Sequence, residues 1–396
     1  MARKLRVLVF MYNTRRYGES LGGAERRILQ FSEFTSNVEI HFLERDPAIA
    51  KFYSKQPSHT AWMPNSNLRV PAQFRAMIWS LTALFSALRL DRNLYFDILI
   101  SHDPEFWNIL PLFFASKLIC RPSVAYLHHT ERTSGNIPAK TFADFYRYFK
   151  GLDYHTASSF LSAVEKILSI NLLKRFNMLL SVSRTTKQDF VDRGVPESKV
   201  VVVDNGVDLT YFSAFRNREK MFDIAYLGRI SPRKGLDDLI YALGKTPNRK
   251  AIVIGGGTSR HVDHYRNLTR TLPNVEFAGY LPDDEAYPLI ASSRLFVFPS
   301  YEEGFGLVIG EAMALGVPVM CYDVPALVEV WGDAVRFVRT GDRQALVEEV
   351  SSLLKDDEQL KELSEKGLSF IAKYDWPNVA LRETEVLRSL AGRGKP

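Results

Sequence analysis

Glu303 and Glu311 flank two glycines, Gly304 and Gly306, in the part of the chain best suited to chemistry. Glycines allow a backbone to approach a ligand closely, and the free N–H groups at the first turn of a helix bind anions. A helix that begins near Leu307 would therefore offer a phosphate site, with Glu311 about 6 Å along its axis at 1.5 Å per residue. Two carboxylates so placed can bind hydroxyl groups on either side of a phosphate. The alternative stays open that Glu303 only caps the helix and that Glu311 is a solvated surface residue.

A second polar turn carries two cations, Arg229 and Lys234, between an apolar run and a helical pattern. The planar guanidinium and the compact ammonium group both pair with phosphate oxygens, which makes the turn a candidate diphosphate site. A basic surface turn explains the same residues. His128 follows another apolar run, where a histidine is either structural or a ligand contact, and the adjacent His129 leaves the choice open.

These residues depend on a scaffold of alternating strands and helices. Short β-branched runs alternate with longer stretches of helical period, a pattern that predicts parallel sheets in an α/β protein. The expected strands form two groups, at 5–11, 38–43, 98–102, 123–128, 178–183 and 200–203, and at 222–227, 251–254, 275–277, 295–298, 317–321 and 335–338. We therefore predict two Rossmann-like domains, 1–205 and 206–375, followed at 376–396 by a helix that packs back on the first domain and a short tail.

The segment 299–319 resembles the donor-binding signature of retaining glycosyltransferases of the GT-B fold, in particular glycosyltransferase family 4. The pattern of that family is E-G-F-G-L-V-x-x-E-A-M-A-x-G-x-P-V, and residues 303–319 match it throughout. Residues 228–235 likewise resemble the G-R-x-x-x-x-K-G turn of the family. The resemblance implies two Rossmann-like domains that face each other across a cleft, and a nucleoside-diphosphate sugar as co-substrate. It implies neither a bound cofactor nor a metal ion.

The resemblance also implies a role for each matched residue. Glu303 would bind hydroxyls of the transferred sugar, and Glu311 would bind the ribose. Arg229 and Lys234 would bind the diphosphate and stabilise the charge that develops on it, in place of the metal ion that other glycosyltransferases use. His128 would contact the sugar. Further donor contacts are expected from glycines and neighbours in the matched loops, namely Gly22, Gly23, Gly256, Gly304, Phe305, Gly306 and Leu307.

Composition excludes several other classes of protein. The chain has 396 residues, 46% of them hydrophobic and 24% charged, which is typical of globular and not of disordered or fibrous proteins. Two cysteines, Cys120 and Cys321, are too few for a disulfide framework or a cysteine-rich zinc site. No apolar run reaches the roughly 20 residues of a membrane-spanning helix, and the N-terminus leads into a strand without a signal-peptide cleavage site. We therefore expect a cytoplasmic protein.

Positive charge is concentrated in the first half of the chain. Residues 1–205 contain 27 Lys and Arg against 18 Asp and Glu, a balance of +9, whereas the remainder has 24 against 27, a balance of −3. Two segments, 137–150 and 69–92, combine basic with aromatic or apolar residues. This composition suits peripheral contact with an anionic membrane, although packing in the core explains it as well. Nucleic acid is not an expected partner, because no recognised binding module accompanies the charge.

The function that these inferences favour is retaining transfer of a hexose-type sugar to a hydroxyl of a glycan or a lipid-linked saccharide. Two alternatives stay open: a non-catalytic sugar-nucleotide-binding protein, and a nucleotide-sugar epimerase of the same fold. The glycines at 255–257 lack the third glycine of a dinucleotide fingerprint, which disfavours a nicotinamide-dependent enzyme. The loop at 324–329 departs from the glycine pair of many relatives, so the resemblance does not identify the sugar.

Overall fold

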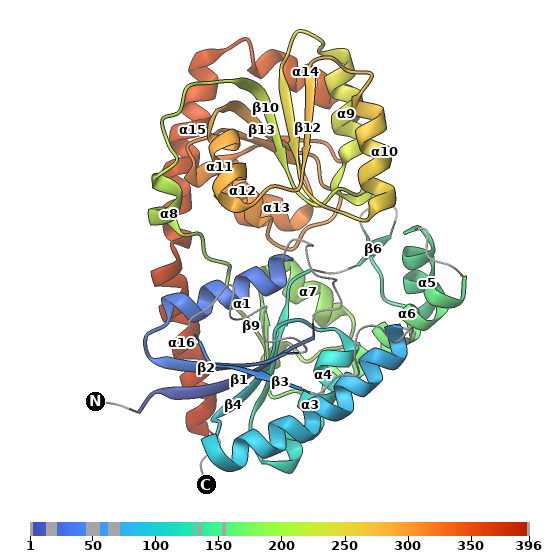
Figure 1. The fold of residues 1–396 in the computed structure, drawn as a ribbon, viewed down its shortest axis with the longest axis vertical. Coiled ribbons are helices and arrows are strands. Elements are labelled where there is room, and N and C mark those ends of the chain that lie inside the picture. The colour runs from blue at the N-terminus through green and yellow to red at the C-terminus, as the bar shows by residue number, and fades with distance from the viewer. Residues whose placement is uncertain are drawn as a thin grey trace. The chain divides into compact units, whose positions relative to one another are not determined.

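The computed structural model describes residues 3–12, 22–44, 56–61, 72–129, 131–133, 137–152 and 156–393. These residues divide into two compact units (Figure 1). The first unit ends at Gly206 and takes up the chain again at Trp376, and the second unit runs from Val207 to Asp375. Each unit is built around one parallel sheet that alternates with helices along the chain, which confirms the predicted α/β class.

The sheet of the first unit has seven parallel strands in the order β3-β2-β1-β4-β5-β8-β9. Strand β1 lies in the middle and pairs with β2 on one side and β4 on the other, so that Val7 is opposite both Ile40 and Ile98. Nearly every residue of β1 is buried, as expected of a parallel sheet covered on both faces. The bounds of the strands are β1 Leu5–Met11, β2 Val38–Glu44, β3 Ser58–Thr60, β4 Ile98–Ser101, β5 Ser123–Leu127, β8 Met178–Ser181 and β9 Val200–Val202.

Two hydrophobic cores cover the two faces of this sheet. Alternate side chains of a strand point to opposite faces, so Val7 and Val9 join one core while Leu8 and Phe10 join the other. The first core includes helices α1 and α16, and the second includes α3, α4 and part of α6 and α7. The bounds of the remaining elements are α1 Gly23–Phe34, α3 Ala72–Leu94, α4 Phe106–Leu118, β6 Arg132–Thr133, β7 Ile137–Pro138, α5 Phe142–Lys150, α6 Thr156–Leu173, α7 Arg184–Asp192 and α16 Trp376–Arg393. None of the helices in the described ranges combines the length and the apolar character needed to cross a bilayer.

The C-terminal helix α16 is fixed to the first unit by a buried ion pair. Arg27 of α1 is fully buried, and its Nη2 lies 2.6 Å from Oε2 of Glu383 on α16. The guanidinium also lies 4.3 Å from the centre of the Tyr126 ring, and the Tyr126 hydroxyl donates to the other carboxylate oxygen of Glu383. A buried charge is stable only when it is paired and hydrogen-bonded. The pair therefore joins α1, β5 and α16.

The sheet of the second unit has six parallel strands in the order β12-β11-β10-β13-β14-β15. The strands are β10 Phe222–Leu227, β11 Ala251–Ile254, β12 Val275–Gly279, β13 Ser293–Phe298, β14 Val319–Tyr322 and β15 Arg336–Val338. The helices are α8 Leu209–Ser213, α9 Leu236–Lys245, α10 Ser259–Thr269, α11 Asp283–Ala291, α12 Leu307–Ala314, α13 Pro325–Trp331, α14 Arg343–Leu353 and α15 Asp357–Ile371.

The two sheets reverse their strand order at equivalent places. In the first unit the reversal lies between β1 and β4, and in the second unit between β10 and β13. Open parallel sheets bind ligands at the carboxyl ends of the strands on either side of such a reversal. The topology therefore predicts that ligand-binding residues lie in the loops that follow these four strands.

Candidate functional site

In the second unit, the loop after β10 and the loop after β13 are in direct backbone contact. Gly235, which ends the first loop, has a φ of +70°, and a Cβ atom built on it would lie 1.7 Å from the carbonyl oxygen of Pro299. No side chain fits in that space, and the positive φ disfavours other residues as well. Glycine at 235 is therefore required for these two loops to meet.

The loop after β11 joins them through two further glycines. A Cβ atom on Gly255, at a φ of +154°, would lie 1.8 Å from the carbonyl oxygen of Gly228, and one on Gly257 would lie 2.5 Å from that of Ile230. Gly256, between them, accepts a hydrogen bond of 2.8 Å from the N–H of Ile230. The three loops at the carboxyl edge of the sheet thus form one continuous backbone surface.

Helix α12 begins where the sequence predicts it, at Leu307. Gly306 is its N-cap in the left-handed conformation, with a φ of +79° and a ψ of 59°. Gly304 and Phe305 are buried in front of it, and the indole N–H of Trp331 donates to the carbonyl oxygen of Phe305 at 2.8 Å. The first turn of α12 is therefore held at the carboxyl end of β13.

Lys234 and Glu303, which the sequence assigns to one ligand, lie side by side. Lys234 Nζ is 2.6 Å from Glu303 Oε1 and donates at 3.0 Å to the carbonyl oxygen of Glu302. The neighbouring Arg233 pairs with the Glu302 carboxylate at 3.0 Å. Arg229 lies in the same loop and is exposed. The structure thus brings cations from the β10 loop together with carboxylates from the β13 loop.

Glu311 lies one turn inside α12 and is only 4% exposed, so the interpretation as a solvated surface residue is excluded. Glu303 does not cap α12 either, because Gly306 is the N-cap and no side chain makes a capping hydrogen bond there. Which ligand groups the two carboxylates bind stays a prediction.

Asp238 stabilises the loops at the carboxyl edge of this sheet, and the sequence did not predict it. Its carboxylate is buried, and it accepts hydrogen bonds from the hydroxyls of Tyr301 and Tyr322 and from the guanidinium of Arg343. Tyr301 lies near the start of the loop that contains Glu303. Asp238 lies in the first turn of α9, shortly after Lys234. Asp238 therefore ties the two loops to each other through side chains.

The first unit carries the other predicted residues. Gly22 is the N-cap of α1 with a φ of −75°, and Gly23 is its exposed first residue. Leu21, at the start of the same motif, lies outside the described residues. The structure places these glycines and His128 in the unit that does not contain Lys234 and Glu303.

His128 follows β5 and is a neutral imidazole. Its Nε2 lies 2.6 Å from the carbonyl oxygen of His102, an acceptor, so Nε2 carries the proton and donates. Burial lowers the pKa of His128 to about 3, and the positive charge of Arg27 contributes to the shift. In the neutral ring Nδ1 is then an acceptor, which suits it to receive a hydrogen bond from a ligand hydroxyl.

His102 and Asp103, at the carboxyl end of β4, are a further polar pair. His102 Nδ1 lies 3.1 Å from the carbonyl oxygen of Phe10, and Nε2 lies 3.3 Å from Asp103 Oδ2. The carbonyl oxygen can only accept, so Nδ1 carries a hydrogen and donates it to this oxygen. Burial raises the pKa of Asp103. Their position directly after a buried strand at 98–101 was the signal in the sequence that could have revealed them.

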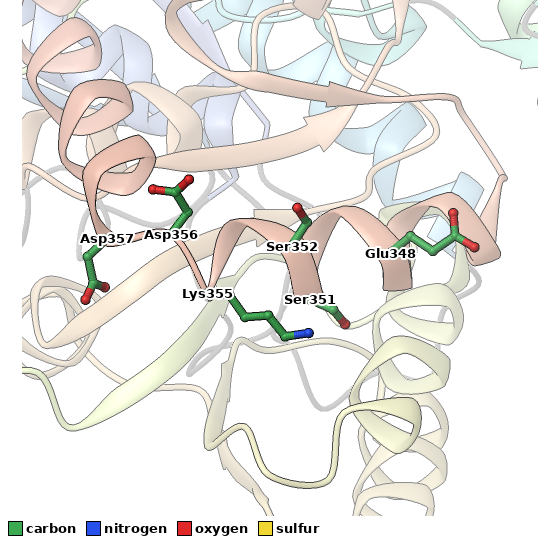
Figure 2. A pocket seen from close by; sticks show the side chains of 6 residues that line it. All are labelled: Glu348, Ser351, Ser352, Lys355, Asp356 and Asp357. Carbon is green, nitrogen blue, oxygen red and sulfur yellow. The ribbon is translucent and has the colours of Figure 1, made fainter.

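A groove lies elsewhere in the second unit. It has a volume of about 630 Å³ and is lined by Glu348, Ser351, Ser352, Lys355, Asp356 and Asp357, from the end of α14 to the start of α15 (Figure 2). Arg294, at the amino end of β13, donates at 3.1 Å to the carbonyl oxygen of Leu354 and pairs with Asp357. The groove therefore lies at the amino edge of the sheet, opposite the predicted site residues.

Two family models match consecutive parts of the chain. Residues 21–211 match Glycosyltransferase Family 4, and residues 209–370 match Glycosyl transferases group 1. Two parallel sheets with this strand order and these loops define the GT-B fold. The chain belongs to glycosyltransferase family 4.

Curated relatives and solved structures agree with this assignment. O-antigen chain mannosyltransferase B of Escherichia coli is 33% identical over 160 residues, 39% of this chain and 42% of the relative. The capsular polysaccharide biosynthesis glycosyltransferase CapM of Staphylococcus aureus is 28% identical over 246 residues, 55% of this chain and 63% of the relative. The matched region thus spans less than two thirds of either relative.

Among solved structures, Anabaena Alr3699/HepE in complex with UDP and glucose aligns with a TM-score of 0.74 at 18% identity, over 97% of this chain and 100% of that one. Sucrose-phosphate synthase from Thermosynechococcus elongatus aligns with a TM-score of 0.76 at 17% identity, over 99% and 100%. At this identity the two likenesses establish the fold.

Proposed function

We propose that the protein transfers a hexose-type sugar from a nucleoside-diphosphate sugar to a hydroxyl of a glycan or lipid-linked saccharide, with retention of the anomeric configuration. The observation that carries the proposal is the contact of Lys234 with Glu303, at 2.6 Å, beside the first turn of α12. A cation, a carboxylate and a helix N-terminus at one sheet edge match the phosphates and hydroxyls of an activated sugar.

The diphosphate of the donor would bind to Arg229, Lys234 and the N–H groups of α12. These groups stabilise the negative charge that grows on the leaving phosphate as the glycosidic bond breaks. Arg229, Lys234 and the N–H groups of α12 would supply the positive charge that a metal ion supplies in other glycosyltransferases. Glu303 would bind hydroxyls of the sugar and Glu311 the ribose, as the match to the family pattern implies.

Transfer would take place on one face of the sugar. The bond between the anomeric carbon and the phosphate oxygen breaks, and the acceptor oxygen forms its new bond to that carbon from the same side. The departing phosphate oxygen takes the proton of the acceptor hydroxyl, so no separate base is required. His128 Nδ1, an acceptor in the neutral ring, would receive a hydrogen bond from a sugar hydroxyl and orient the ring.

Relatives with related substrates support the choice of donor and acceptor. The similar proteins include the O-antigen and capsular polysaccharide glycosyltransferases reported above, and a phosphatidyl-myo-inositol mannosyltransferase of Propionibacterium freudenreichii that is 29% identical over 241 residues. The two mannosyltransferases among them support a hexose as the transferred group, and the names of all three support a saccharide or lipid-linked acceptor.

Alanine variants of the two cations test the proposal. Arg229→Ala and Lys234→Ala should each lower kcat by about 10²-fold or more, the scale of a lost transition-state donor. Lys245→Ala is the matched control, because this exposed lysine lies at the far end of α9 from Lys234. Unchanged kcat in either of the first two variants contradicts the assignment.

The donor and the reaction class are tested with a panel of nucleoside-diphosphate sugars. The true donor should raise the melting temperature and be hydrolysed slowly without acceptor. A shift without turnover identifies a non-catalytic binding protein, and conversion of the free donor to its epimer identifies an epimerase. NMR of the anomeric proton of the product, with and without EDTA, tests retention and independence of metal ions.

A further inference from the structure

Helix α3 exposes a continuous apolar stripe. Phe74, Met77, Leu81 and Phe85 are exposed to 57, 42, 54 and 68%. Their spacing of three and four residues places them on one face of the helix, and no charged residue lies between 76 and 88. The opposite face, with Trp79 as its largest side chain, is buried in the core. Both faces of α3 are therefore apolar, although the structure buries only one of them.

Helices packed next to α3 also expose apolar side chains. Phe114 and Leu118 on α4, which packs on α3, are 50 and 64% exposed. Figure 1 shows α3 in light blue, running along the outer margin of the first unit. Phe160 and Leu161 on α6, which packs on α4, are 52 and 45% exposed. Exposed apolar side chains on neighbouring helices are typical of a site for a protein or membrane partner.

The charge of the exposed side chains in this part of the first unit indicates the kind of partner. Among the described residues from 72 to 175, the exposed acidic side chains amount to Glu105 alone. The exposed basic side chains in the same ranges are Arg89, Arg92, Lys117, Lys140, Arg147, Lys150 and Arg175. A second copy of the chain would bring the same positive charge to the contact and be repelled. Anionic lipid head groups attract it, while the apolar stripe enters the acyl boundary.

The aromatic segment at 137–150 contributes less to this surface than its composition suggests. Phe145 of α5 is buried against Ala163 and Ile170 of α6, and Tyr148 is buried too. Phe142 packs edge-on against Phe160. Arg69, at the start of the other basic segment, lies outside the described residues. The surface is therefore carried by α3, with α4 and α6 beside it.

We propose that the outer face of α3 lies in the head-group region of an anionic bilayer, with Phe74, Met77, Leu81 and Phe85 inserted and Arg89 and Arg92 on head groups. The protein would bind the membrane reversibly through this helix. For the transfer proposed above, such a position favours an acceptor that is itself anchored in the membrane. The binding surface does not depend on that transfer, and it is tested separately.

Sedimentation with vesicles tests the surface. The full chain should sediment with phosphatidylglycerol-containing vesicles at low salt and much less with phosphatidylcholine alone. Leu81→Glu should reduce this binding at least tenfold, because it places a charge in the middle of the stripe. Met221→Glu is the matched control, since Met221 is 55% exposed, as Leu81 is 54%, but lies in the second unit. Arg89→Gln with Arg92→Gln should lower binding and weaken its dependence on salt.

Several results overturn the proposal. These are failure of the wild type to bind anionic vesicles, equal binding to neutral ones, or wild-type binding by Leu81→Glu. A concentration-dependent dimer that Leu81→Glu disrupts would assign the stripe to contact between copies and overturn the proposal too. Donor hydrolysis by Leu81→Glu should equal that of the wild type. This measurement separates loss of the membrane surface from loss of the proposed transferase activity.

Discussion

The two units share a strand order, but their carboxyl edges are built from different chemistry. In the second unit, backbone contact through Gly235 and Gly255 brings the loops together, and Lys234 with Glu303 supplies opposite charges. In the first unit, the edge carries the imidazoles of His102 and His128, each bonded to a backbone carbonyl oxygen. Topology thus fixes where a ligand can bind, and the loops decide whether the edge suits charged phosphates or neutral hydroxyls.

The edges also differ in what supports them. Beneath the first edge lies the fully buried pair of Arg27 and Glu383, close enough for Arg27 to contribute to the lowered pKa of His128. At the second edge, Asp238 accepts hydrogen bonds from three side chains, which come from the loop after β13, from β14 and from α14. One edge therefore depends on a charge pair in the core, and the other on glycine contacts and an anchored carboxylate.

The largest effect is expected beneath the first edge. Glu383→Gln should lower the free energy of unfolding by about 3–5 kcal/mol, because it leaves Arg27 buried without its counter-charge. Urea denaturation measures the change. Glu385→Gln, an exposed glutamate on the same helix, serves as the control and should leave the free energy of unfolding unchanged. A loss as small as that of the control would show that the pair does not support the first unit.

A smaller but more local effect is expected at the second edge. Gly235→Ala should cost about 3 kcal/mol or more and abolish donor binding, because its Cβ would collide with Pro299. Gly316→Ala is the control. Gly316 has a similar φ of +75°, but a Cβ atom built on it would meet no atom closer than Leu368 Cδ1, at 3.6 Å. This variant should show only the cost of the left-handed conformation, about 1–2 kcal/mol. Equal losses in the two variants would mean that close approach of the loops is not what requires glycine.

Loss of one neutral hydrogen bond should have a smaller effect on activity. His128→Ala should lower kcat/KM about tenfold, equivalent to the roughly 1–1.5 kcal/mol of such a bond. His129→Ala, which removes the exposed neighbouring imidazole, should retain wild-type kcat/KM. The reverse result would transfer the predicted sugar contact from His128 to His129.

The lowered pKa of His128 predicts how stability depends on pH. Between pH 6.5 and about pH 3 the unfolded chain holds a proton on His128 that the folded chain does not. Stability should therefore fall as the pH decreases through this range, by up to about 1.4 kcal/mol per pH unit from this residue. The slope of unfolding free energy against pH, measured for the wild type and for His128→Asn, isolates this contribution. Identical slopes would refute it.

The scaffold was the part of the molecule that sequence patterns predicted best. Strands β1 and β10 begin and end at the predicted residues, because continuous apolar runs in a buried parallel sheet have clear limits. Strand β3, Ser58–Thr60, was missed because a short polar strand at a sheet edge has no apolar signature. The prediction of a GT-B fold was confirmed.

Some residues of the candidate site could be predicted from the sequence, and others could not. Gly235 and Gly306 carry signals that local sequence can show, since a positive φ or a close backbone approach demands glycine. Asp238 carries none, because its partner Tyr322 lies 84 residues further along the chain. The partner of Arg27 lies 356 residues away. Contacts of this kind depend on the completed fold, and a single sequence does not reveal them.

The position of α16 has a consequence for how the molecule is made. The first unit is completed by residues from Trp376 onward, which are translated after the whole of Val207–Asp375 in the second unit. The second unit can therefore fold before the first is complete, whereas the sheet translated first must wait for α16 to be synthesised before Arg27 is buried and its core is closed. Expression of residues 1–206 alone should accordingly yield an aggregation-prone fragment that a separately added α16 peptide stabilises.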